Sequence, residues 1–140
     1  MRLTTRSRYG TRLVLDIAQN QDKGPVSVSQ ISKRQDISVK YLEGLIWELK
    51  KAGYIDSVRG AKGGHLLNKA PEHITIAEIV DVLEGNSHLV ECDPEDNPCP
   101  RAENCPTRRL WKDVEQLVYD KLSSVTIEDL MQQGNLLELD

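Results

Sequence analysis

Apolar residues recur at helical spacing along most of the chain, and this pattern predicts helices joined by short loops. A first helix is expected over residues 5–19, a short second helix over residues 28–34, and a longer third helix from its N-cap Ser38 to Ala52. The apolar face of the third helix follows an i, i+3, i+4, i+7 spacing and contains Leu42, Leu45, Ile46 and Leu49. These helices can therefore bury one face each in a shared core.

Capping and turn residues place the boundaries between the elements. Ser27 and Gln30 form a capping box at the start of the second helix, and Thr75 and Glu78 form another at the start of a fourth helix. Gly53 is placed to end the third helix in the left-handed conformation that glycine tolerates. The segments YIDSVRG and GHLLN carry β-type residues on either side of a Gly-rich turn, so a β-hairpin is expected there.

Residues 85–105 show no periodicity, and a loop of this length needs a functional explanation. From Pro106 a further helix is expected, with an apolar band wide enough to cover both its own body and a partner. That band contains Leu110, Trp111, Val114, Leu117, Val118 and Leu122. Thr126 then caps a last short helix, which is expected to end at Met131. The predicted fold class is mainly α with a small β-hairpin.

The composition limits the core and the location of the protein. The 140-residue chain is 39% hydrophobic but has no phenylalanine, so its core must be aliphatic. It contains no run of about 18 apolar residues, so no membrane-spanning helix is expected. The first residues carry charge through their apolar stretch, so a signal peptide is not expected. We expect a cytoplasmic protein, in which cysteines stay reduced and favour metal or redox roles.

Charge divides the chain into two unlike halves. The net charge of −4 alone argues against nucleic acid as a partner. Residues 1–69, however, hold 13 Lys and Arg against 6 Asp and Glu, a net +7, whereas residues 70–140 hold 5 against 16, a net −11. A basic face for a polyanion, joined to an acidic module with another task, explains this segregation. Ordinary solvated surface charge is the simpler alternative.

The order helix, short helix, turn, longer helix and β-hairpin is that of a winged helix-turn-helix domain. In such domains the recognition helix presents its exposed N-terminal residues to the DNA major groove. The residues that the apolar stripe leaves exposed there are Ser38, Lys40, Tyr41, Glu43 and Gly44. Lys40 can neutralise a phosphate, Tyr41 can hydrogen-bond or stack, and Glu43 can accept from a cytosine amino group. Each is also common on an ordinary helix surface, and Gly44 lowers helix propensity without an evident reason.

The turn of the predicted hairpin, RGAKGG, carries the two cations Arg59 and Lys62 among three glycines. Glycine lets the backbone approach a groove closely, and arginine is favoured in a narrow minor groove, where the potential is most negative. The segment lacks the Gly-Lys-Ser/Thr ending of a phosphate-binding nucleotide loop. We therefore expect a DNA-contacting wing, with an ordinary tight turn as the alternative.

All three cysteines, Cys92, Cys99 and Cys105, fall within fourteen residues. An odd number of thiols cannot be closed by disulfides alone, but thiolates are suited to holding zinc or an iron–sulfur cluster. Cys105 stands at an expected helix start, where the helix dipole lowers the pKa of a thiol. Both kinds of centre take four ligands, so a fourth must come from another residue type or another chain. The spacing alone does not choose between zinc and a cluster.

Four segments together, MRLTTRSRYGTR, SVKYLEGLIWELKKAGYI, SVRGAKGG and CPTRRLW, closely resemble IscR-type winged-helix transcriptional regulators of bacteria, a family with NsrR, RirA and CymR members. The resemblance covers nearly the whole chain. It implies a winged helix-turn-helix domain plus a long dimerisation helix, in a homodimer that binds a palindromic operator in double-stranded promoter DNA. By position it assigns DNA binding to Ser38, Lys40, Tyr41, Glu43 and Arg59, and cluster binding to Cys92, Cys99 and Cys105.

Two positions depart from the family's pattern. In the best-known IscR proteins a histidine after the third cysteine is the fourth ligand of a [2Fe–2S] cluster, and here Arg108 stands at that position. NsrR-like relatives complete a [4Fe–4S] cluster with a carboxylate from the partner's first helix, where this chain has Arg8. His65 and His73 are expected to be structural or surface residues. The candidates that remain for the fourth ligand are a residue of a partner chain or His88, Glu91, Asp93 and Glu103.

The leading hypothesis is a DNA-binding transcription regulator, acting as a repressor, that senses an iron–sulfur cluster, [2Fe–2S] in type, and controls cluster biogenesis or related iron and redox genes. The alternative is a CymR-like regulator without a cluster, which responds through zinc, thiol oxidation or a partner protein. Because nothing fixes a histidine near the cysteines, an enzyme is not expected. We expect a DNA-binding domain over residues 1–84, a cluster-binding loop over residues 85–105, and the dimerisation and C-terminal helices over residues 106–140.

Overall fold

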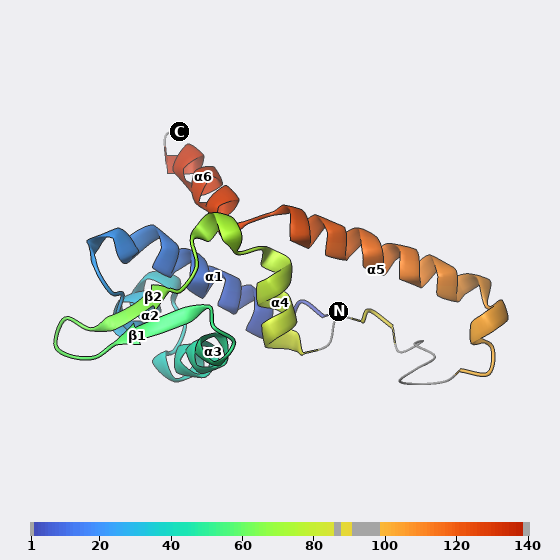
Figure 1. Ribbon diagram of the computed structural model, residues 1–140, viewed down its shortest axis with the longest axis horizontal. Helices are drawn as coiled ribbons and strands as arrows, with labels where there is room; N and C mark the ends of the chain where they lie inside the picture. The colour runs from blue at the N-terminus through green and yellow to red at the C-terminus, as the bar shows by residue number, and fades with distance from the viewer. Residues whose placement is uncertain (1, 86–87, 91–98, 139–140) are drawn as a thin grey trace.

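The computed structural model describes residues 2–85, 88–90 and 99–138 of the chain. Within these residues the fold is mainly helical, with a two-stranded antiparallel hairpin at one edge (Figure 1). The predicted fold class is therefore confirmed. In the part of the chain that the structure describes, no helix is both long and apolar enough to cross a lipid bilayer.

The first three helices lie where the apolar pattern predicts them. They are α1 (Thr5–Asn20), α2 (Val28–Gln35) and α3 (Val39–Lys51). The capping box before α2 is confirmed, because the Ser27 hydroxyl accepts from the Gln30 backbone N–H and the Gln30 side chain accepts from the Ser27 N–H, each at 3.2 Å. Ser38 caps α3 as predicted. Local side-chain chemistry thus fixes where both helices begin.

A β-hairpin follows α3. Gly53 adopts φ +89° just after the helix, the left-handed conformation expected of it. Strand β1 (Ile55–Val58) then pairs with β2 (Gly64–Leu67). A bridge between Val26 and His65 joins the hairpin to the loop before α2. Strand β2 is therefore fixed to the helical part, and the turn between the strands extends outward (Figure 1).

Three further helices complete the described part of the fold. They are α4 (Ile76–Glu84), α5 (Pro106–Ser124) and α6 (Ile127–Glu138), with 3₁₀ turns at Gln21–Lys23, Pro71–His73 and Ala102–Asn104. The capping box at α4 is confirmed, since the Thr75 N–H donates to the Glu78 carboxylate at 2.7 Å. The prediction that the last helix ends at Met131 is wrong, because α6 continues to Glu138. The two glutamines after Met131 are good helix formers, and Gly134 lies close to the Gln19 side chain of α1, so the helix and its contact with α1 both continue past Met131.

The core of the described residues is aliphatic, as the absence of phenylalanine requires. Its largest fully buried apolar side chains come from α1 to α4, β1, the segment before α4, and α6. They are Leu13, Val14, Ile17, Ile31, Leu42, Leu45, Leu49, Ile55, Ile74, Ile79 and Ile127. The predicted apolar stripe of α3 is buried in full, which leaves the opposite face of α3 toward solvent.

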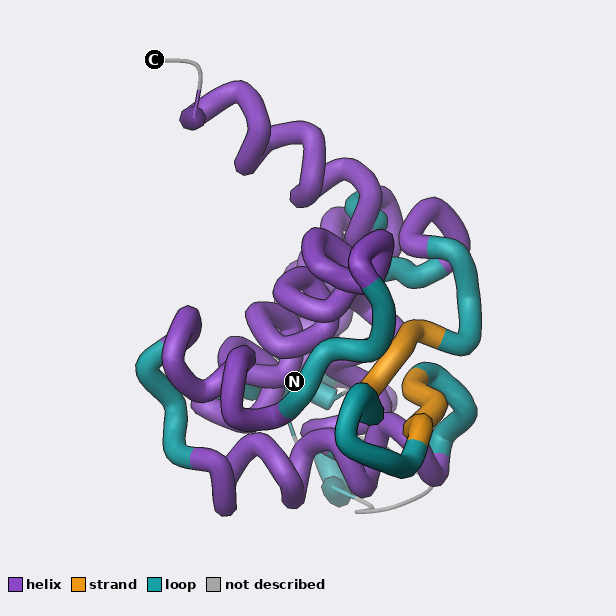
Figure 2. The backbone as a smooth tube through the Cα atoms, turned by 90° about the vertical axis from the view of Figure 1, so that its left-hand side faces the viewer, coloured by secondary structure: helices purple, strands orange, loops and turns teal. Residues whose placement is uncertain are grey.

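The chain returns to this core after α5. The Ile127 N–H donates to the Ile74 carbonyl and the Ile76 N–H donates to the Val125 carbonyl, both at 2.9 Å. Helix α6 contacts the 3₁₀ turn before α4 and rises there from the head, which is formed by α1 to α4 and the hairpin (Figures 1 and 2). Since Ile127 is completely buried, the C-terminal end of α5 is anchored to the same core as α1 and α4.

Helix α5 lies mostly outside this core. None of its 19 residues is buried, and its N-terminal end extends away from the body of the molecule (Figure 1). Val118 and Leu122 are partly buried against the core. By contrast, Leu110, Val114 and Leu117 are 52%, 37% and 69% exposed. The broad apolar band of this helix is thus divided between an inner face and an exposed outer face.

Two helical glycines form a matched pair for a stability test. A Cβ at Gly10 would lie 2.0 Å from Leu83 Cδ1, whereas one at Gly44 would meet no atom within 4 Å. Because Leu83 is itself buried, we expect Gly10→Ala to lower the free energy of unfolding by about 1 kcal/mol despite its better helix propensity. Gly44→Ala should raise it by about 0.8 kcal/mol. Urea unfolding at equal protein concentration measures both changes, and a stabilised Gly10→Ala protein would contradict the crowding of the α1–α4 crossing.

Candidate functional site

The outer face of α3 carries the polar residues predicted from its sequence. Lys40, Glu43 and Gly44 are exposed. The Ser38 hydroxyl, also at the exposed start of the helix, accepts from the Tyr41 N–H at 3.2 Å. This face can therefore offer a cation, a carboxylate and a nearly bare stretch of backbone to a groove.

Tyr41 lies differently, at the boundary between α3 and α1. It is half-buried, and its ring meets the Tyr9 ring edge-on with 5.8 Å between centroids. Its hydroxyl lies 3.2 Å from Thr5 Oγ1. Tyr41 thus joins α3 to the start of α1, and it borders a surface hollow that Lys40 also lines. A DNA contact through its hydroxyl stays a prediction.

An ion pair that the sequence did not reveal fixes α3 against its neighbours. The Arg6 guanidinium pairs with Glu48, and the Arg6 Nε donates to the Leu83 carbonyl in α4 at 3.0 Å. The hydrogen bond with Glu48 raises the pKa of Arg6. Nearby, the Thr4 N–H and hydroxyl donate to the Glu84 carboxylate at 2.9 and 2.6 Å. The start of α1 therefore holds both α3 and α4, so it sets how α3 projects from the core.

Arg59 and Lys62 lie on the exposed tip of the hairpin. The tip requires glycine at two positions, because Gly60 has φ +115° and a Cβ at Gly63 would lie 2.2 Å from the Val58 carbonyl oxygen. Strand β1 contacts α3, and the hairpin lies next to that helix (Figure 1). The two predicted cations therefore extend from the same head as the outer face of α3.

The two histidines of the head, His65 and His73, are structural and surface residues as expected, and neither belongs to the cysteine segment, residues 92–105. His65 Nδ1 lies 3.0 Å from the Ser57 hydroxyl on the neighbouring strand, and burial lowers the pKa of His65. His73 is exposed beside Glu72. His65 therefore has a structural place in the hairpin, and His73 is a surface residue.

The cysteine segment is described from residue 99 onward, and Cys92 lies outside the described residues. Cys99 is exposed, and Cys105 is partly exposed at the N-cap of α5. The Cys105 sulfur lies 3.1 Å from the Thr107 hydroxyl. The hydrogen bond with Thr107, followed by that from the Arg108 backbone N–H, lowers the pKa of the Cys105 thiol. The direction is the one expected at a helix start, and it favours a thiolate ligand.

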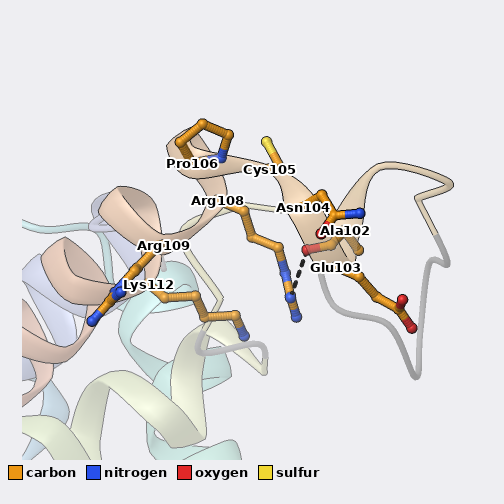
Figure 3. Close-up of a pocket in the computed structure, with 8 residues that line it drawn as sticks. All are labelled: Ala102, Glu103, Asn104, Cys105, Pro106, Arg108, Arg109 and Lys112. Atoms are coloured by element: carbon orange, nitrogen blue, oxygen red, sulfur yellow. Dashed lines mark hydrogen bonds between the residues drawn. The ribbon is translucent and has the colours of Figure 1, made fainter.

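Arg108, where the resemblance expects a histidine, turns back along the cysteine segment (Figure 3). Its Nη1 donates to the Ala102 carbonyl at 3.0 Å, while the Cys105 sulfur points to the other side. Arg108 lines an open hollow at the start of α5 together with Arg109 and Lys112. The guanidinium thus ties the 3₁₀ turn to α5. It cannot ligate a metal, because it stays protonated.

His88 lies against the middle of α5. Its Nδ1 is 3.2 Å from one oxygen of the Glu115 carboxylate, and the other oxygen accepts from the Leu89 N–H at 2.9 Å. Burial raises the pKa of Glu115, but the hydrogen bonds from Leu89 and His88 outweigh that effect and leave it lowered. Glu115 therefore fixes the described part of the loop after α4 to the side of α5.

The donor set of the cysteine segment fits a thiolate-held centre but leaves one ligand unassigned. Cys99 and Cys105 flank the 3₁₀ turn, and thiolates select soft metals and clusters. Among the described residues, no three His, Cys, Asp or Glu side chains gather as a metal-binding group. Of the candidate fourth ligands, Glu103 is exposed in the turn, and Glu91 and Asp93 lie outside the described residues.

Sequence comparisons place the chain among regulators. Residues 3–133 match the Rrf2 family model, described as an iron-dependent transcriptional regulator. Protein rrf2 of Nitratidesulfovibrio vulgaris, strain Hildenborough, is 49% identical over 136 residues, which cover 97% of this chain and 91% of that protein. The similarity therefore extends over both the head and the cysteine segment.

Solved structures share the fold. CymR, the global cysteine regulator of B. subtilis, matches with a TM-score of 0.81 and 34% identity, over 95% of this chain and 98% of its own. The IscR of T. potens matches with a TM-score of 0.79 and 34% identity, over 96% of this chain and 88% of its own. Both matches confirm the winged helix-turn-helix arrangement predicted from the order of elements.

Proposed function

The chain belongs to the Rrf2 family of transcriptional regulators, and from this premise we propose that it is a repressor whose affinity for operator DNA depends on an iron–sulfur cluster. The proposed cluster ligands are Cys92, Cys99 and Cys105. The genes it controls serve cluster biogenesis or related iron and redox functions. The family consists of transcription regulators, so no enzymatic activity is assigned to the chain.

DNA binding is assigned to the outer face of α3 and to the hairpin tip. The proposed contacts are Ser38, Lys40, Tyr41 and Glu43 in the major groove, with Arg59 and Lys62 at the wing. Arg59 is assigned to the minor groove, where its charge meets the most negative potential. The net +7 of residues 1–69 supports this assignment. Because each phosphate contact releases counterions, binding should weaken steeply as salt rises.

A second copy of the chain is assigned to the outer face of α5. Leu110, Val114 and Leu117 follow an i, i+4, i+7 spacing on that face and are exposed in the single chain. A two-fold axis through this face would bring the same apolar residues of the two copies into contact with each other. It would also present two heads to the two half-sites of a palindromic operator.

The observation that carries the cluster proposal is that the cysteine segment leads directly into α5, with Cys105 as the N-cap of that helix. When bound, the cluster supplies an iron- and redox-sensitive centre held by thiolates. Ligation fixes the N-terminal end of α5, and Ile127 already anchors the opposite end to the head. A change in the cysteine segment therefore changes which distances between the two heads of the dimer are most populated, and this changes the affinity for DNA.

The proposed cluster is [2Fe–2S], as the family resemblance implies. Arg108 cannot supply the fourth ligand, since it is a guanidinium engaged with Ala102. The proposed sources are therefore a residue of the partner chain or one of His88, Glu91, Asp93 and Glu103.

A second function is favoured by the close fit to the structure of CymR. In this alternative the dimer binds DNA without a cluster, and the cysteines hold zinc or respond to thiol oxidation or a partner protein. Arg108 at the place of the expected histidine is the observation that favours it.

Anaerobic purification followed by visible and Mössbauer spectra, with iron and sulfide quantification, tests the proposal. The wild-type protein should be brown, with about two iron and two sulfide per chain. Cys99→Ala should lose the visible absorbance, and the exposure of Cys99 makes a folding defect unexpected. Arg108→Ala is the matched control in the same segment and should keep the cluster, because the guanidinium is not a ligand.

The affinity for operator DNA is then compared with and without the cluster. The proposal expects the two forms to differ, and it expects Cys99→Ala to behave like the cluster-free form. A colourless wild-type protein loaded with zinc would overturn the cluster assignment. Equal DNA binding before and after reconstitution would favour the CymR-like alternative.

A further inference from the structure

Gly44 has no structural reason to be glycine. It lies inside α3 with φ in the ordinary helical region, and a Cβ there would meet no atom of the described residues within 4 Å. Glycine is a poor helix former, second only to proline. A helix that keeps glycine at an open, exposed position gains nothing from the described part of its own chain. The missing side chain therefore points to something outside the chain that approaches α3 closely.

Trp47, one turn further along α3, is the second unexplained residue. At 62% exposure it is the most exposed large apolar side chain of the described part of residues 2–85. It is not part of the buried core. The Lys51 ammonium lies 5.1 Å from its ring centroid, and the residue lines a surface hollow together with Val82. An exposed indole offers a large apolar surface together with a polar N–H, and tryptophan is enriched at binding interfaces for this reason.

The two residues lie on one stripe. Lys40, Gly44, Trp47 and Lys51 are spaced i, i+4, i+7 and i+11, so they share one face of α3. That face is opposite the buried stripe of the helix. The order along it is a cation, a bare backbone, an indole and a second cation. Cations at both ends of an apolar surface complement a polyanion that carries apolar groups between its phosphates.

The DNA major groove has this chemistry. Its only apolar base group is the 5-methyl of thymine, and its walls are lined by phosphates. The rise of a helix puts Trp47 about 10 Å beyond Lys40 along the axis, which is within the groove width of about 12 Å. A side chain at Gly44, between the two, would hold the helix away from the base edges.

We propose that Gly44 and Trp47 form a specificity element of α3 in which the bare backbone at Gly44 lets the helix sit deep in the major groove and the Trp47 indole contacts thymine methyl groups. This inference rests on the proposed DNA-binding function. Lys40 and Lys51 hold the flanking phosphates, and Lys51 leaves the indole face as it does so. The chain therefore prefers half-sites with thymine at the positions that Trp47 reaches.

The first arm of the test selects duplexes from a random pool with the wild-type protein. Each thymine of the selected sequence is then replaced by deoxyuridine, which removes only the 5-methyl group. At the positions that Trp47 contacts, wild-type affinity should fall about fourfold per methyl, the value of one buried carbon. Trp47→Ala should bind less tightly and show no difference between thymine and uracil there. Uracil at the other positions is the matched control.

The second arm uses Gly44→Ala and Gly44→Leu. Both should raise the melting temperature by a few degrees through better helix propensity. Both should also weaken binding to the selected duplex, by about tenfold for leucine, because the side chain displaces the helix from the groove. A merely structural role for Gly44 would move stability and DNA affinity in the same direction.

The outcomes separate this inference from the function on which it rests. A wild-type protein that selects no sequence from the pool would overturn DNA recognition itself. If the wild type selects a sequence and Arg59→Ala weakens its binding, the function stands. If the Trp47→Ala protein then selects the same DNA sequence and shows the same loss of affinity with uracil, the specificity element alone is overturned. The exposed Trp47 would in that case point to a protein partner.

Discussion

Replacing Leu117 with lysine is expected to convert the proposed dimer into a monomer and to weaken binding to the proposed palindromic operator by at least about 100-fold. Leu117 is 69% exposed on the outer face of α5, beside Val114 and Leu110. The proposed occupant of that face is a second copy of the chain. The substitution removes an apolar contact and puts a charge where water would be excluded.

Symmetry makes the effect large. Burying a leucine side chain contributes about 1.5–3 kcal/mol, and in a two-fold interface each substitution acts twice. The expected loss is therefore about 3–6 kcal/mol, or about two to four orders of magnitude in the dimer dissociation constant. A monomer reads only one half-site at a time, so it also loses the effective concentration that links the two heads.

Sedimentation equilibrium over a series of protein concentrations measures the change, and Gln116→Lys is the matched control. Gln116 is exposed on the same helix but away from the apolar stripe, and its replacement adds the same charge. It should leave the dimer intact. A Leu117→Lys protein that stays dimeric and binds the operator as tightly as the wild type would contradict the assignment of this face to a second copy.

The sequence predicted the parts of the fold that depend on neighbouring residues. The capping boxes at Ser27 and Thr75 and the left-handed Gly53 are local, so each could be read from a few residues and each is confirmed. The apolar stripe of α3 could be predicted equally well, because helical spacing alone defines it. The end of α6 was predicted wrongly, because the apolar spacing is interrupted after Met131 while the helix continues through Gln132, Gln133 and Gly134.

The site was predictable only in part, because its supports join residues far apart in the chain. No spacing links Arg6 to Glu48, which lie 42 residues apart, and no pattern turns the Tyr41 ring toward Tyr9. The exposed cations of the wing could be read from composition and turn chemistry. The hydrogen bond from Arg108 to the Ala102 carbonyl could not be predicted, because a basic residue at a helix start can equally well point into solvent.

Asp16 is a buried residue that the apolar pattern did not identify. Substitution of its partner, Arg34, is expected to have the second large effect, on the free energy of unfolding. Asp16 is 1% exposed on α1, and its carboxylate accepts from Arg34 Nε and Nη2 at 3.0 and 2.7 Å and from Gln35 Nε2 at 2.9 Å. Helix α2 has only Ile31 fully buried. This buried carboxylate is therefore a main attachment of α2 to α1.

Arg34→Ala is expected to lower the free energy of unfolding by about 3 kcal/mol, because it leaves the Asp16 carboxylate buried with only the Gln35 amide as a partner. Urea unfolding at a fixed protein concentration measures the loss. Arg8→Ala is the matched control. It removes the same charge from an exposed position on α1 and should change stability by no more than about 0.5 kcal/mol.

A second substitution shows whether Arg34→Ala destabilises the protein by leaving a buried charge unpaired or by removing side-chain packing. In the wild-type background Asp16→Asn should destabilise, because it weakens charge-assisted hydrogen bonds to Arg34. In the Arg34→Ala background it should restore about 1 kcal/mol, because it removes the unpaired buried charge. The sign of the effect thus reverses with the partner. Further destabilisation of Arg34→Ala by Asp16→Asn would contradict this account, because it would mean that the buried carboxylate is satisfied without Arg34.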